Sequence, residues 1–206
     1  MMQITQAEAE ISVIKKIMDD SRRIAVYNGK HYILWGVLVS IALFANYVMV
    51  LMHIELNYQG FMWFILMISG AITGSIMERM EHRKKAVRTF AGKLLSTLWF
   101  ASGIAMFMFG FLGTIVHAYD PIFICPIIFT ILGVSYYTSG EIQQTGWFKY
   151  LSFGWWAGAV LLFIFPGIHT LLISGLMMLG LQTIPGIILY RKWKKEIEVT
   201  SHSWAS

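Results

Sequence analysis

Charged residues are scarce in this sequence, because Asp, Glu, Lys and Arg together make up only 13% of its 206 residues. A soluble domain usually carries about 25% of such residues. Hydrophobic residues make up 57% of the chain, which leaves too little polar surface for a compact monomer in water. The scarcity of charge therefore argues against a soluble domain and favours a protein whose solvent is the lipid bilayer.

Cysteine is almost absent as well. A single cysteine, Cys125, excludes an intramolecular disulfide and a CxxC metal or redox site. The sequence also contains no glycine-rich phosphate loop, no nucleophile elbow and no Ser/His/Asp set. The loops are too short to build a soluble active site, so the sequence favours a protein that is not an enzyme.

Long apolar stretches dominate the chain. Each has roughly twenty residues, the length that a helix needs to cross a hydrocarbon core. Backbone groups in lipid must be satisfied internally, and these stretches lack the polar–apolar alternation of barrel strands. Six spanning helices are predicted, at about 32–52, 61–77, 94–116, 121–138, 148–165 and 170–190.

The predicted fold is an all-α integral membrane bundle of three sequential hairpins, with a transmembrane domain at 31–190 and a tail at 191–206. No cleavable signal peptide is expected, because the first apolar run is too long for one. Residues 1–30 form a cytoplasmic segment with helical spacing of apolar residues between 3 and 24. This amphipathic helix is predicted either to lie along the membrane or to dock a partner protein or a second protomer.

The basic residues are concentrated on one side of the predicted spans. The sixteen Lys and Arg residues precede the first span, separate the second from the third, border the fifth at Lys149, or follow the sixth. By the positive-inside rule, both termini are predicted to be cytoplasmic. The basic segments are predicted to attract anionic lipid headgroups, and the net charge of +5 is not taken to indicate nucleic-acid binding.

Polar residues inside the spans are the first candidate site. Asn46 and Gln182 lie within the first and sixth spans, where a polar group without a partner is costly. Tyr136 and Tyr137 lie near the end of the fourth span. These side chains are predicted either to hold helices together or to line a ligand pocket near a helix kink at Pro185. The spans contain no carboxylate, which disfavours a proton-coupled pump.

Residues at the three predicted hairpin tips are the second candidate site. They are His53 and Glu55, His117 and Asp120, and His169. Imidazole and carboxylate groups suit a transition metal, or the histidines could ligate haem, if the three tips meet. The alternatives are histidines that simply lie at the membrane interface, or that sense protons.

Two pairs of glycines in the spans indicate close packing between helices. Residues 70–74 and 154–158 each begin and end with glycine, a spacing that permits close helix crossing. Such crossings can occur within one bundle or between the protomers of a homo-oligomer.

The N-terminal region carries a resemblance to a known group of proteins. The stretch 14–24, Ile-Lys-Lys-Ile-Met-Asp-Asp-Ser-Arg-Arg-Ile, is followed by Asn28 and Gly29 and then by Trp35 and Gly36. Over about the first forty residues, the chain resembles small multi-pass inner-membrane proteins of bacteria that have no assigned activity. The resemblance implies a bacterial plasma membrane and no particular site.

Three functions follow from these features. The leading expectation is a protein that binds or passes a small ligand through the helical bundle. The alternative is a sensor or scaffold that signals through its basic cytoplasmic face. The third is a membrane metal- or haem-binding protein that uses the histidines at the hairpin tips.

Overall fold

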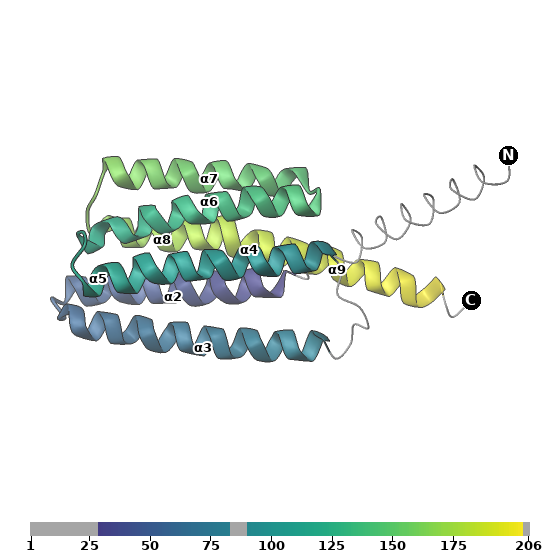
Figure 1. Ribbon diagram of the computed structural model, residues 1–206, viewed down its shortest axis with the longest axis horizontal. Coiled ribbons are helices and arrows are strands. Elements are labelled where there is room, and N and C mark those ends of the chain that lie inside the picture. Colours follow the sequence, from purple (N-terminus) through teal and green to yellow (C-terminus); the bar gives the residue numbers. More distant parts are fainter. Residues whose placement is uncertain (1–28, 83–89, 204–206) are drawn as a thin grey trace, which may run out of the picture.

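The computed structural model describes residues 29–82 and 90–203, and these residues fold into helices (Figure 1). Six of the described helical segments are long and apolar enough to cross a membrane: Lys30–Leu51, Leu56–Met80, Phe90–Ile115, Pro121–Gln143, Gly146–Ile164 and His169–Lys195. The prediction of an all-helical chain with six such segments is therefore confirmed. The predicted helix at 3–24 lies outside the described residues.

Three of the six segments change helix type along their length. The elements are α2 (Lys30–Leu51), α3 (Leu56–His82), α4 (Phe90–Phe107), the π-helical η1 (Met108–Leu112), α5 (Gly113–Ile115), the 3-10 turn η2 (Pro121–Phe123), α6 (Ile124–Gln143), α7 (Gly146–Ile164), α8 (His169–Met178), the π-helical η3 (Leu179–Thr183) and α9 (Ile184–Ser203). Pro185 follows η3 closely. Proline lacks an amide proton and clashes with the carbonyl four residues earlier, and the wider π-helical turn just before Pro185 accommodates it; the kink predicted there stays a prediction.

Successive segments run in opposite directions, so the loops alternate between two ends of the molecule (Figure 1). Loops 52–55, 116–120 and 165–168 lie at one end, which we call the opposite end. Loop 144–145 and the C-terminal part of α9 lie at the other, which we call the basic end. Every Lys and Arg of the described residues belongs to it: Lys30, Arg79, Lys93, Lys149, Arg191, Lys192, Lys194 and Lys195.

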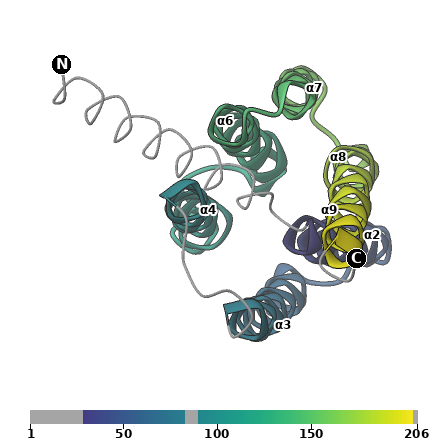
Figure 2. The same cartoon turned by 90° about the vertical axis from the view of Figure 1, so that its right-hand side faces the viewer.

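The closest packing does not follow the predicted hairpins. Among the described helices, α6 makes its most extensive contact with α7, and α2 packs along α8, η3 and α9 (Figure 2). Glycine allows the latter approach, because a Cβ on Gly186 would lie 2.9 Å from the backbone nitrogen of Ile33. The first and sixth spans, which are far apart in sequence, are thus close neighbours.

Both glycine pairs found in the sequence serve packing within the chain. Gly70 and Gly74 on α3 face Trp35 and His31 on α2, while Gly154 on α7 faces Leu181. These glycines let bulky side chains of the neighbouring helix approach the backbone. The GxxxG spacing is therefore used here between helices of one bundle.

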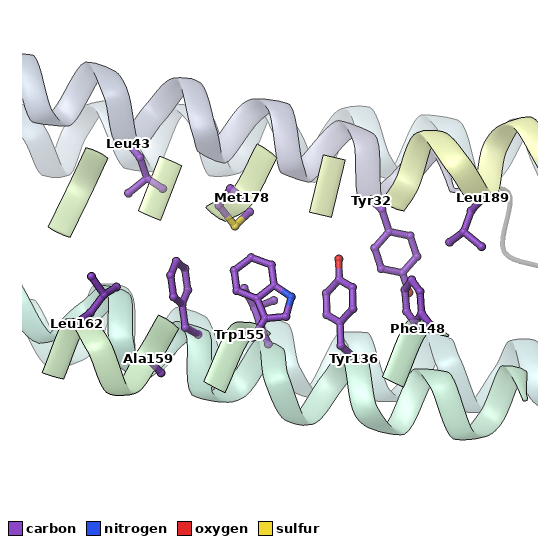
Figure 3. Close-up of a cluster of buried hydrophobic side chains, with 11 residues drawn as sticks. Tyr32, Leu43, Tyr136, Phe148, Trp155, Ala159, Leu162, Met178 and Leu189 are labelled. Carbon is purple, nitrogen blue, oxygen red and sulfur yellow. The ribbon is translucent and has the colours of Figure 1, made fainter. Parts of the chain in front are cut away.

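Within the described part of the chain, a buried core lies between the α6–α7 pair and the α2–α8–α9 group (Figure 3). Its members are Tyr32, Leu43, Phe129, Leu132, Tyr136, Phe148, Trp155, Ala159, Leu162, Met178 and Leu189. By contrast, the apolar side chains of α3 and α4 are largely exposed at the surface of the bundle. Apolar residues exposed along spanning helices are what a lipid solvent requires.

Candidate functional site

Five aromatic rings meet at the centre of the core, around Tyr136. The centroid of the Tyr136 ring lies 4.9 Å from that of Phe148, 5.6 Å from Tyr32, 5.7 Å from Trp99 and 5.8 Å from Trp155. We call these five residues the aromatic cluster. Because its rings come from α2, α4, α6 and α7, the cluster joins four of the spanning helices.

Helical spacing explains how the sequence assembles this cluster. Phe129 and Tyr136 on α6 are seven residues apart, as are Phe148 and Trp155 on α7, so each pair lies on one face of its helix. The two faces meet where α6 packs against α7. Tyr32, from the first turns of α2, closes the cluster at the side towards the basic end and meets Phe148 edge-on, at a centroid distance of 5.3 Å.

The cluster contains polar atoms that make no hydrogen bond. The Tyr136 hydroxyl and the indole nitrogens of Trp99 and Trp155 are buried and have no hydrogen-bond partner within residues 29–82 and 90–203. Figure 3 shows the Trp155 nitrogen on the edge of its ring that faces Tyr136, and the Tyr136 hydroxyl pointing towards the α2 and α9 side. Leaving a buried donor unpaired costs about 1–3 kcal/mol.

Gln182 belongs to the same interior. It lies on η3, between Met178 and Leu189, both of which pack in the core that contains Tyr136. Gln182 is only 4% exposed, and its carbonyl oxygen Oε1 has no partner among the residues that the structure describes. The interior therefore offers one unpaired amide oxygen in addition to the unpaired donors of the aromatic cluster.

Asn46 does not share this site with Gln182. Gly36 on α2 packs against Thr183, next to Gln182. Asn46 follows ten residues later on α2, which is about 15 Å further along the helix axis at 1.5 Å per residue. Its Oδ1 atom is also buried without a partner in the described part of the chain. The two amides predicted as one candidate set are thus separate features.

Tyr137 also lies apart from the interior site. It is 39% exposed and stacks on Trp156 at the surface of the bundle, with a centroid distance of 6.0 Å. Because successive helical residues are rotated by about 100°, its neighbour Tyr136 points into the core instead. The structure therefore brings Tyr136 and Gln182 into the interior and leaves Tyr137 outside.

The predicted metal ligands at the opposite end are not brought together. Among the described residues, no group of three or more His, Cys, Asp or Glu side chains is placed to hold a metal ion. This range includes His53, His117, His169, Glu55 and Asp120. The described residues therefore do not form the cluster of three or more ligands that the transition-metal hypothesis requires, and the haem alternative stays a prediction.

These residues instead have local structural roles. His53 and His117 adopt positive φ angles of 57° and 53° at the ends of helical segments, a conformation in which histidine is enriched. The carboxylate of Asp120 accepts a hydrogen bond of 2.9 Å from the backbone N–H of Ile122, which caps η2. The ring of His169 lies against Tyr47, at a centroid distance of 6.3 Å.

The sequence did not identify the tryptophans of the interior. Tryptophan is common at the membrane interface, so Trp99 and Trp155 carried no distinctive signal. The available clue was position, because Trp155 lies near the middle of its span rather than at an end.

A shallow hollow of about 310 Å³ lies on the outer surface of α3, lined by Ala71, Ile72, Ser75, Ile76 and Arg79. The hydroxyl of Ser75 donates to the Ala71 carbonyl of its own helix, at 2.8 Å, and is not directed into the hollow as a free donor. This surface feature is separate from the aromatic cluster.

Comparison with known proteins yields no relative for this chain. No protein family, curated protein or solved structure matches it. A proposal for the function of the chain therefore rests on the geometry of its interior and on the distribution of its charged residues.

Proposed function

We propose that the chain is an inner-membrane protein of bacteria that crosses the bilayer six times as three sequential hairpins, with both termini in the cytoplasm. The described Lys and Arg residues gather at the basic end, and loops 52–55, 116–120 and 165–168 at the opposite end contain none. This asymmetry supports a cytoplasmic basic end by the positive-inside rule.

Within that membrane domain, we propose that the aromatic cluster binds a small ligand. The observation that carries this proposal is the presence of three buried donors without partners in the described residues, on Trp99, Tyr136 and Trp155. An indole N–H can only donate, and a phenol most readily donates as well. The complementary ligand is a small aromatic molecule that carries an acceptor oxygen, such as a carbonyl.

Two polar contacts in the same bundle differ from those of the aromatic cluster, because their groups are paired across helices. The hydroxyls of Ser102 and Ser135 lie 2.8 Å apart and join α4 to α6. The Ser40 hydroxyl donates to the Gly175 carbonyl across α2 and α8, at 3.1 Å. These groups are paired across helix interfaces, as structural polar residues in membranes are. The unpaired donors of the aromatic cluster do not serve that purpose.

Binding is favoured over passage of the ligand through the bundle. The rings of the aromatic cluster are in contact, and Tyr136 and Trp155 are both 0% exposed, so the interior is closed. A ligand has to separate the rings. The π-helical η3 beside them supplies a place where the sixth span can rearrange, since such segments often mark functional sites.

Acetophenone, an aromatic ring with one carbonyl oxygen, is a suitable probe. In detergent, it should raise the unfolding temperature of the wild type and of Tyr137→Phe, because a ligand that binds only the folded state stabilises it. The increase should be smaller for Tyr136→Phe, which lacks one donor. Ethylbenzene, which has no acceptor oxygen, is the matched control. Equal shifts for the three proteins, or for the two compounds, would contradict the proposal.

Sensing is a second candidate, and it is favoured by the continuity of the sixth span. Helix α9 begins directly after η3 and continues past Lys195, so one helix connects the interior with the basic end. A change in η3 on ligand binding can therefore be transmitted to the basic surface. An environment-sensitive dye at Lys195→Cys, in a Cys125→Ser background, should change its emission when acetophenone binds; an unchanged emission with proven binding would exclude this role.

A further inference from the structure

Lysine side chains at the basic end lie over aromatic rings. The ammonium nitrogen of Lys30 lies 5.3 Å from the centroid of the Trp193 ring and 6.0 Å from that of Tyr190. The ammonium nitrogen of Lys192 lies 5.5 Å from the centroid of the Trp147 ring. These distances fall within the range of about 6 Å over which a cation is attracted to a ring face.

The backbone holds these groups in a fixed arrangement. Gly29, the residue before α2, has a φ of +70°, and a Cβ there would lie 2.8 Å from the backbone nitrogen of Tyr190. The start of α2 is therefore pressed against α9. The rings of Tyr190 and Trp193 stack, with a centroid distance of 5.9 Å and an interplanar angle of 26°. Lys30 thus approaches a preformed aromatic face rather than a mobile side chain.

Helix α9 lies between the two lysine contacts. Trp193 on α9 meets Lys30 from α2, whereas Lys192 on α9 meets Trp147 from α7. Trp147 is the second residue of α7, so its ring lies at the N-terminal end of that helix, where the helix dipole favours negative charge. Glu141, the acid on the last turn of α6, forms an ion pair with Lys149 and its charge is compensated.

The position of these residues along the helices indicates the depth in the membrane at which they lie. The apolar part of the sixth span ends at Tyr190, and Arg191 follows it. Tryptophan and tyrosine at such boundaries lie at the depth of the lipid headgroups. A group bound here is therefore in contact with both the headgroup layer and the first carbons of the acyl chains.

We propose that Lys30 and Lys192, together with the rings of Trp147 and Trp193, form a binding site for the headgroup of an anionic phospholipid. The ammonium group of Lys192 contacts the lipid phosphate beside the Trp147 ring, which contacts the glycerol backbone, and Lys30 adds positive charge beside Trp193 on the other side of α9. Charge complementarity selects an anionic lipid over a zwitterionic one, because each lysine near the surface favours an anionic lipid. This site is independent of the ligand proposed for the aromatic cluster.

The proposal is tested by titrating the purified protein in detergent with phosphatidylglycerol or phosphatidylcholine and counting bound lipids by native mass spectrometry. Phosphatidylglycerol should bind more tightly than phosphatidylcholine. Lys192→Gln should weaken phosphatidylglycerol binding about fivefold, the loss expected for one lysine at the membrane surface. Lys192→Arg, which keeps the charge and the ring contact, should restore most of the affinity.

Lys195→Gln is the matched control, because Lys195 is exposed on the same helix about one turn further and the substitution removes the same charge. It should change the affinity less than twofold, because in detergent the protein meets single lipids rather than a charged membrane surface and Lys195 is not part of the proposed site. If Lys195→Gln and Lys192→Gln weaken binding equally, the effect is general surface charge and the proposed site is wrong. Trp147→Leu, with both lysines intact, should weaken binding as much as Lys192→Gln does, and an unchanged affinity would contradict the role of the ring.

A soluble phosphate compound is the competing source of the same chemistry. Glycerol 3-phosphate carries the headgroup phosphate without acyl chains, so it should displace phosphatidylglycerol poorly. Displacement at equal concentration would show that the site takes a soluble phosphate ligand, and the lipid proposal would fail. Because none of these measurements uses acetophenone, their outcome is separate from that of the ligand site in the core.

Discussion

Tyr136 and Tyr137 are adjacent in sequence but lie on different faces of α6, one turned into the core and the other to the surface. The ring of Tyr136 stacks on Phe148 in the core, at a centroid distance of 4.9 Å, while that of Tyr137 stacks on Trp156 at the surface. The pair therefore provides a comparison in which one hydroxyl is removed from the interior and the other from the exterior of the same helix turn.

Tyr136→Phe should leave the protein as stable as the wild type or make it more stable by up to about 1–3 kcal/mol. The reason is that the substitution removes a buried hydroxyl that has no hydrogen-bond partner in the described residues, together with its desolvation penalty. Tyr137→Phe, at the surface, should change stability by less than about 0.5 kcal/mol. Unfolding of the ligand-free protein in detergent measures both. A large loss of stability in Tyr136→Phe would show that its hydroxyl is bonded.

The paired serines should behave in the opposite way. Ser102→Ala removes the hydrogen bond to Ser135 that joins α4 to α6, and comparable bonds in membrane bundles contribute about 0.6 kcal/mol on average. In a Ser135→Ala background, Ser102→Ala should lower the free energy of unfolding by less than it does in the wild type. A double-mutant cycle measures this coupling, and additive losses would contradict a direct bond. Ser75→Ala, on the outer surface of α3, is the control.

The spanning helices could be predicted from composition because lipid imposes one simple requirement, an apolar length. Their ends were less predictable. Helix α3 begins at Leu56 rather than at 61, since Asn57, Tyr58 and Gln59 are polar but helical. The amide of Gln59 donates to the Ile54 carbonyl, at 2.8 Å, and so satisfies a backbone group at the helix start. Hydropathy alone does not register such a contact.

Helix pairing and the site could be predicted only in part. All sides of a spanning helix are apolar, so hydrophobic periodicity does not distinguish the side that faces protein from the side that faces lipid. Glycine gave the better signal, as at Gly70 and Gly154. The candidate Gln182 was found because an amide is rare in a span, whereas Trp99 and Trp155 were missed because tryptophan is common there.

The contact between the first and sixth spans should depend on Gly186. A Cβ at this position would lie 2.9 Å from the Ile33 backbone, which cannot move aside as a flexible side chain can. Gly186→Ala should therefore destabilise the protein by about 1–3 kcal/mol. Gly103→Ala is the control, because a Cβ there meets nothing within 4 Å. It should be neutral or slightly stabilising, since alanine favours helix more than glycine does. Similar unfolding temperatures for the two variants would contradict the close approach.

Tyr119 should make the stability of the opposite end sensitive to high pH. Its hydroxyl donates to the Phe109 carbonyl within the π-helical η1, and Gly113 leaves room for its ring. Burial raises the pKa of Tyr119 above the usual phenol value of 10.0.

At pH values between the unfolded pKa and the higher folded pKa, more of the unfolded chain than of the folded protein has lost the phenol proton. The contribution of Tyr119 to folding stability is therefore fully present below pH 10 and declines as the pH rises through the folded pKa. Unfolding of the wild type should therefore become easier as the pH rises above 10, and that decline should be smaller in Tyr119→Phe. The same variant should be less stable than the wild type at pH 8, because the Phe109 carbonyl loses its donor. Identical pH profiles for the two proteins would show that the phenol is equally exposed in the folded and unfolded states.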